Sequence, residues 1–111
     1  MDVFDTGFLL VKVDFDQAYL HGDYMSEIGK LIQDSEGKFA DFGFVEAFLS
    51  DESLYFYVYH MKASDEEMIR QETRLLVEEK RQKGIQLVCG ISHMYQGIRE
   101  LFRARNDCIR Q

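Results

Sequence analysis

The sequence is poor in the features that mark several classes of protein. It has no Trp and no Pro, and its two cysteines, Cys89 and Cys108, lack the CxxC spacing of metal and redox sites. We therefore expect two free thiols in a reducing cytoplasm. No apolar run reaches the ~20 residues that cross a bilayer, and the first residues lack the basic stretch of a secretory signal. These absences favour a cytoplasmic protein that does not contact a membrane.

Positive charge is also scarce, because 13 basic residues stand against 20 acidic ones and give a net charge of −7. A field of that sign repels phosphate backbones, so we expect no direct nucleic-acid contact by this segment. What the chain does contain is 46% hydrophobic and 30% charged residues, which is a globular composition. A chain of 111 residues is long enough to bury one core, so we expect residues 1–111 to form a single domain.

Hydrophobic periodicity predicts the order of secondary structure. The predicted strands cover 8–15, 42–49, 54–61 and 85–91, and the predicted helices cover 17–33, the stretch between Ser64 and Gly84, and 94–109. The polar run 34–38 is expected to be a loop, and Ser64 with Glu67 is expected to form a capping box. The resulting order is βαββαβα. It predicts an α+β fold with a four-stranded antiparallel sheet and helices on one face, the ferredoxin-like arrangement.

Two acidic residues at the end of the first strand are the strongest chemical candidates. Asp14 and Asp16 lie just past an apolar run, where two carboxylates would suit Mg²⁺ with a bound triphosphate. The alternative is that they end the strand and cap the next helix. The turn 49–54 has no glycine that would let the backbone approach a phosphate, so its acids Asp51 and Glu52 are interpreted as ordinary turn residues. The second interpretation is favoured, and no metal site is assigned.

Other reactive side chains lack partners at useful spacing. His21, His60 and His93 show neither an i,i+4 pair nor an HExxH pattern. Ser92 has no G-x-S-x-G elbow, and neither cysteine has a paired His nearby in the pattern. We therefore assign no catalytic residue and no cofactor.

Two surfaces are candidates for contact with partners. Tyr55, Tyr57 and Tyr59 alternate along the third strand and share one face of it. This row is either an exposed interaction face or a cross-strand aromatic cluster that only stabilises the sheet, and both interpretations stay open. The last helix is basic in an acidic domain and carries Arg99, Arg103, Arg105 and Arg110. It is expected to lead into a further basic module or to bind an acidic surface elsewhere in the same chain.

Three segments carry a family resemblance. They are the strand 10–16 (Leu-Val-Lys-Val-Asp-Phe-Asp), the strand 87–92 (Leu-Val-Cys-Gly-Ile-Ser) and the helical run 98–108. In these the chain resembles the degenerate GGDEF-like domains in the middle of AraC-type (YesN-like) bacterial transcription regulators. In active cyclases of that fold, the acid matching Asp14 binds metal together with an acid of the central turn. Only Asp51 or Glu52 could stand in for the second acid, and the glycines of that turn are missing.

The resemblance implies a regulatory role without catalysis. We expect a non-catalytic domain of a longer regulator, whose helix-turn-helix part lies beyond Gln111. Such a domain would act by contact with neighbouring domains of the same chain or by forming a homodimer. The alternative is a domain that binds a nucleotide or another small ligand near Asp14 and Asp16.

Overall fold

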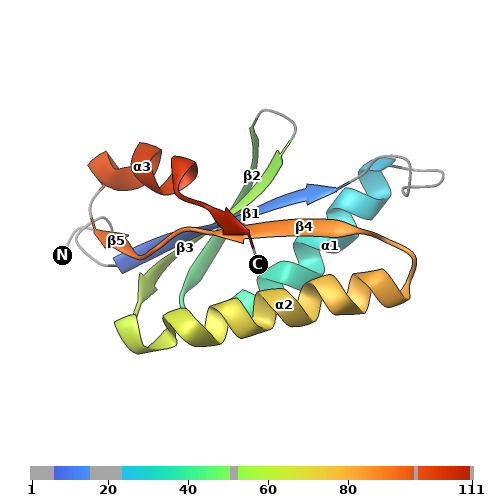
Figure 1. The fold of residues 1–111 in the computed structure, drawn as a ribbon, viewed down its shortest axis with the longest axis horizontal. Helices are drawn as coiled ribbons and strands as arrows, with labels where there is room; N and C mark the ends of the chain where they lie inside the picture. Colours follow the sequence, from blue (N-terminus) through green and yellow to red (C-terminus); the bar gives the residue numbers. More distant parts are fainter. Residues whose placement is uncertain (1–6, 16–23, 51–52, 97, 111) are drawn as a thin grey trace.

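The computed structural model describes residues 7–15, 24–50, 53–96 and 98–110 (Figure 1). The elements in chain order are β1 (Gly7–Phe15), α1 (Tyr24–Phe39), β2 (Phe44–Ser50), β3 (Ser53–Met61), the 3₁₀ turn η3 (Ala63–Asp65), α2 (Glu66–Gln82), β4 (Leu87–Ile91), β5 (Tyr95–Gln96), the 3₁₀ turn η4 (Ile98–Glu100), α3 (Leu101–Asn106) and β6 (Ile109–Arg110). The predicted α+β order β1-α1-β2-β3-α2-β4 is confirmed.

The strands form one sheet in which every pair is antiparallel. Its order is β2-β3-β1-β4-β6, and the two-residue β5 pairs with the start of β1. The four long strands therefore make the predicted four-stranded antiparallel sheet, which β5 and β6 extend. β1 lies in the middle, and its residues from Phe8 to Val11 are fully buried. A strand that is apolar on both faces has to be covered on both, which is why this run takes the central place.

The two faces of the sheet carry separate apolar clusters. On one face, side chains of α1 and α2 such as Leu31 and Leu76 pack against Val11, Phe56 and Ile91 of the strands. On the other face a smaller cluster holds the remaining apolar side chains of β1 and β3 and one residue of α3: Phe8, Leu10, Tyr55 and Ala104. Figure 1 shows α1 and α2 on one side of the sheet and α3 on the other. The prediction that all helices share one face was wrong for α3.

The first described helix ends later than the sequence pattern indicated. Residues 34–38, predicted to be a loop, belong to α1, whose described part runs from Tyr24 to Phe39. The start of the predicted helix at 17 lies outside the described residues. The polar run is helical because its charges face α2: Asp34 contacts Lys80 at 2.7 Å, and Lys38 contacts Glu79 at 3.1 Å. Ion pairs with α2 thus stabilise the helical conformation of a segment whose local sequence predicted a loop.

The start of α2 also differs from the prediction. Asp65 is the N-cap residue, and neither it nor the preceding turn forms a side-chain cap, so the capping box of Ser64 and Glu67 is absent. A 3₁₀ turn replaces it, in which the Asp65 N–H donates to the Lys62 carbonyl at 3.0 Å. The predicted stop at Gly84 is confirmed, because this glycine has φ +83°.

The last segment is not the single helix that was predicted for 94–109. It contains β5, a 3₁₀ turn, the six-residue α3 and β6. The Tyr95 hydroxyl donates to Asp107 Oδ2 at 2.7 Å, which joins the two ends of the segment. Ser92, which follows β4, is buried and bonds to β1: its hydroxyl accepts from the Leu10 N–H at 2.9 Å. These contacts fold the segment back over the sheet.

The strand β3 contains one irregularity near its end. Tyr59 pairs with Phe8 and Met61 pairs with Gly7, so His60 lies between two paired positions. Its φ is +60°, the only positive φ of a residue other than glycine in the described part of the chain. An extra residue of this kind is a β-bulge, which bends the strand and keeps Met61 directed to the core. Because the bulge interrupts the alternation of side chains after Tyr59, Tyr59 is the last tyrosine of the row.

Candidate functional site

The carboxylate of Asp14 lies at the end of β1 and is paired within the chain. The Ser53 hydroxyl donates to Asp14 Oδ1, and the Lys12 ammonium is 3.8 Å from Asp14 Oδ2. Ser53 starts β3, and β3 pairs with β1 over residues that bring the hydroxyl beside Asp14. Asp16, and the turn acids Asp51 and Glu52, lie outside the described residues. Of the acids singled out in the sequence, only Asp14 can therefore be placed, and its nearest partners are a hydroxyl and an ammonium.

The tyrosine row forms a ladder of aromatic contacts across β2 and β3. Phe48 stacks on Tyr55 with ring centroids 5.2 Å apart, and Phe44 stacks on Tyr59 at 5.6 Å. Tyr57 lies between them and is 5.1 Å from Tyr59. Tyr55 is buried, whereas Tyr57 and Tyr59 are half-buried. The cross-strand cluster anticipated in the sequence is thus present, and it stabilises the hairpin.

The ladder changes the acidity of two of its phenols. Burial raises the pKa of Tyr57 above its usual value of 10.0. Burial also raises the pKa of Tyr59, and so does the hydrogen bond that its hydroxyl donates to Glu46 at 3.2 Å. Both hydroxyls are therefore protonated donors at neutral pH. Neither is a base, and the single proton of the Tyr59 hydroxyl is already donated to Glu46.

The ladder leaves its outer phenylalanines open to solvent. Phe44 is 62% exposed and Phe48 is 38% exposed, although both are large apolar side chains. Both belong to β2, the strand at the end of the sheet. Sequence reasoning singled out the tyrosines of β3 and missed these two residues. The alternation of Phe44, Glu46 and Phe48 was the available signal, because it places these three side chains on one face of the strand.

A groove of about 330 Å³ runs between this aromatic ladder and α3. Its lining consists of the apolar side chains and arginines that meet there: Leu10, Phe48, Arg99, Leu101, Phe102 and Arg105. The Arg105 guanidinium lies over the Tyr55 ring, 5.5 Å from its centroid. Phe102 is 73% exposed on the rim. The groove thus combines an apolar floor with two arginines, in a domain whose net charge is −7.

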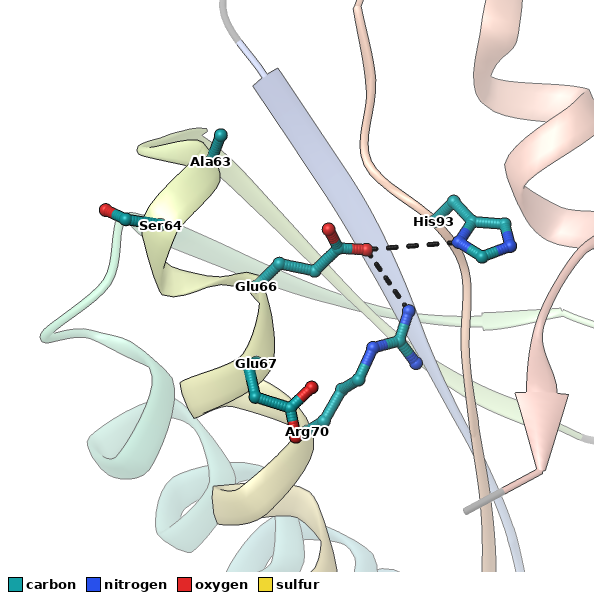
Figure 2. Close-up of a pocket in the computed structure, with 6 residues that line it drawn as sticks. All are labelled: Ala63, Ser64, Glu66, Glu67, Arg70 and His93. Atoms are coloured by element: carbon teal, nitrogen blue, oxygen red, sulfur yellow. Dashed lines mark hydrogen bonds and ion pairs between the residues drawn. The ribbon is translucent and has the colours of Figure 1, made fainter.

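A second hollow, of about 400 Å³, lies at the start of α2 (Figure 2). Figure 2 shows the Glu66 carboxylate between two nitrogen-bearing side chains: the Arg70 guanidinium at 3.2 Å and the His93 ring at 4.0 Å. Arg70 also donates to the Ser92 carbonyl at 3.2 Å. The same three side chains therefore connect α2 to the segment that follows β4. This arrangement is an anchor between elements, because each member already has a partner within the fold.

The two histidines that the structure describes do not form a metal site. The described residues contain no group of three or more His, Cys, Asp or Glu side chains that could hold a metal ion. The sequence did not reveal that Glu66 and His93 lie close together, because they are far apart along the chain and come from different elements. His21 lies outside the described residues.

Both thiols are free and poorly suited to nucleophilic chemistry. Burial raises the pKa of Cys89 to about 12, and burial raises the pKa of Cys108 to about 11. A thiol must lose its proton to act as a nucleophile, so neither cysteine is reactive near neutral pH.

Comparison with known proteins adds no family. Neither a scan against protein-family models nor a search of curated proteins gives a significant match.

Among the helices that the structure describes, none combines the length and apolar character needed to cross a bilayer.

Proposed function

We propose that the chain is a non-catalytic regulatory domain with a ferredoxin-like, GGDEF-like architecture. It acts by contact with neighbouring domains of the same transcription regulator or with a second copy of itself. The antiparallel order β2-β3-β1-β4, with α1 and α2 as the crossing helices, supports this architecture. The segments 10–16 and 87–92, which carry the family resemblance, overlap β1 and β4, and those two strands are neighbours in the sheet.

The observation that carries the proposal is the pairing of Asp14. In a cyclase of the resembled fold, this carboxylate would be a metal ligand. Here one oxygen accepts a hydrogen bond from the Ser53 hydroxyl and the other faces the Lys12 ammonium. A lysine at this position opposes the approach of a divalent cation, because the two positive charges repel. The carboxylate has a structural role instead, joining β1 to β3.

The remaining features support a role in contact. Open aromatic side chains on β2 and the groove beside α3 provide surface of the composition found at protein interfaces, because the lining contains Phe and Arg and no Lys. The two free thiols support placing the domain in a reducing cytoplasm. No part of this role requires a cofactor.

An assay with GTP and Mg²⁺ tests the absence of catalysis. The chain is incubated with GTP and Mg²⁺, the products are separated by chromatography, and thermal melts are recorded with and without nucleotide. We expect no cyclic dinucleotide and no change in Tm. The matched variant is Asp14→Asn, which should lower Tm through the lost Ser53 and Lys12 contacts and should behave like the parent chain toward nucleotide. Product formation, or a nucleotide-dependent rise in Tm that Asp14→Asn abolishes, contradicts the proposal.

A further inference from the structure

The strand β2 presents an edge that no other described strand pairs with. It is the terminal strand in the order β2-β3-β1-β4-β6 and is seven residues long. Along that edge the backbone N–H and C=O groups of a strand are available to another chain. Three of its seven residues are large exposed apolar side chains: Phe44, Phe48 and Leu49. Length, apolar character and an open edge are the properties that favour pairing with another strand.

The usual protections of an edge strand are missing from β2. Proteins discourage pairing with proline, lysine or a bulge on such strands. The segment 44–50 has no proline and no lysine, and its register with β3 runs without interruption from Phe44 to Ser50. Its single charge is Glu46, on the same face as the two exposed phenylalanines. The bulge at His60 lies on β3 and leaves β2 regular.

We propose that two copies of this chain pair through the open edges of β2, antiparallel and centred on Ala47. The inference deepens the contact role proposed above and rests on it. With the two-fold axis at Ala47, Val45 of one copy lies opposite Leu49 of the other, and Glu46 lies opposite Phe48. The small Ala47 side chains meet at the axis. The two sheets become one, and their aromatic ladders lie on the same face.

Charge complementarity favours a second copy as the occupant. A register centred on Glu46 would place two carboxylates opposite each other, which is unfavourable. The register centred on Ala47 separates them and places each Glu46 beside Phe48 of the other copy. The Glu46 carboxylate of one copy therefore lies one strand spacing, about 4.8 Å, from Phe48 of the other copy. Phe48 in turn lines the groove that contains Arg99 and Arg105.

Sedimentation of the whole chain tests the association. We expect a monomer–dimer equilibrium over the micromolar range. Glu46→Lys should weaken the association about tenfold or more, because an interfacial attraction becomes a repulsion. The matched control is Glu67→Lys, which makes the same charge change at an exposed position on α2, away from β2. Its association should equal that of the parent chain.

Disulfide trapping tests the register. Glu46→Cys and Phe48→Cys place thiols at positions that lie opposite each other across the two copies, where Cα atoms are about 4.5–5.5 Å apart. An equimolar mixture of the two variants should form an interchain disulfide on mild oxidation. Either variant alone should not, because like positions are then about 8 Å apart, beyond the ~7 Å limit for a disulfide. Cys89 and Cys108 add little background, because burial keeps both thiols protonated.

The results separate this inference from the function on which it rests. A chain that sediments as a monomer at all concentrations overturns the β2 pairing, and so does a dimer that is unaffected by Glu46→Lys. A disulfide that forms as readily in Glu46→Cys alone, or in Phe48→Cys alone, as in the mixture overturns the register. None of these results bears on the nucleotide assay, whose failure would instead contradict the non-catalytic role.

Discussion

The ion pair between α1 and α2 should contribute measurably to the stability of the fold. Lys80 Nζ is 2.7 Å from Asp34 Oδ2, and the Lys80 side chain is only 5% exposed whereas that of Asp34 is 41% exposed. Replacing Asp34 by Asn keeps the shape but removes the charge that balances a buried ammonium. Breaking a fully buried pair costs about 3–5 kcal/mol, and breaking an exposed pair costs about 0–1 kcal/mol. For this half-exposed pair we expect a loss of about 1–3 kcal/mol.

Urea unfolding followed by circular dichroism measures that loss. Asp34→Asn should lower the urea concentration at the midpoint of unfolding. The dependence of the unfolding free energy on urea should not change, since both chains expose the same surface area when they unfold. Glu79→Gln is the matched control, because Glu79 pairs with Lys38 across the same two helices but is itself 55% exposed. That variant should lose less than about 1 kcal/mol. Equal losses in the two variants would refute the argument from burial.

The same pair fixes the direction of a pH effect. The hydrogen bond from Lys80 lowers the pKa of Asp34 below its ordinary value of 3.8. A carboxyl whose pKa is lower in the folded state stabilises the fold above its unfolded pKa, and that contribution disappears as the pH falls through the folded pKa. The difference between the parent chain and Asp34→Asn should therefore be constant at neutral pH and shrink in acid below 3.8. A difference that grows on acidification would contradict this assignment.

Three further predictions concern glycines and a thiol. Gly37→Ala should stabilise the fold by about 0.5–1 kcal/mol, because this glycine lies in α1 and an added Cβ meets no atom within 4 Å; a lower Tm would contradict it. Gly43→Ala should destabilise by about 1–3 kcal/mol, since its Cβ would lie 2.3 Å from the Tyr59 carbonyl oxygen, and urea unfolding checks this. Cys89 should react with a disulfide reagent at mildly alkaline pH only as fast as the protein unfolds, because its thiol is buried with a pKa of about 12; rapid labelling of the native protein would show otherwise.

The sequence pattern predicted the central part of the fold well. The tyrosines of β3 and the alternation of β2 are features of a hairpin whose two faces differ, and the structure confirms both strands within a few residues. The apolar run 8–15 was predicted to be a strand, and it forms β1, the middle strand of the sheet. Gly84 indicated the end of α2, because helices often end at a glycine with positive φ, and Gly84 has this conformation.

The errors arose where distant contacts outweigh local pattern. Asp34 and Lys38 resemble loop residues until Lys80 and Glu79 of another helix are placed beside them. The segment 94–109 has helical spacing, but the bond from Tyr95 to Asp107 folds it back on itself. Arg105 was predicted to belong to the basic last helix, and the structure places it over the Tyr55 ring on the sheet.

The candidate site was only partly accessible from the sequence. Asp14 could be singled out because it follows an apolar strand, but its partner Ser53 belongs to a strand 39 positions away. No spacing rule connects the two residues. The sequence favoured a structural role for Asp14 over ligand binding, and the contacts with Ser53 and Lys12 that bear on this choice became visible only in the structure.

Nuclear magnetic resonance titration with GTP and Mg²⁺ tests the central claim most directly. The backbone amides of Lys12, Asp14 and Ser53 report on the carboxylate that a nucleotide-bound metal would need. The account predicts that these signals do not move as nucleotide and Mg²⁺ are added to excess. Saturable shifts confined to these amides, lost in Asp14→Asn, would contradict it and establish a ligand site at the end of β1.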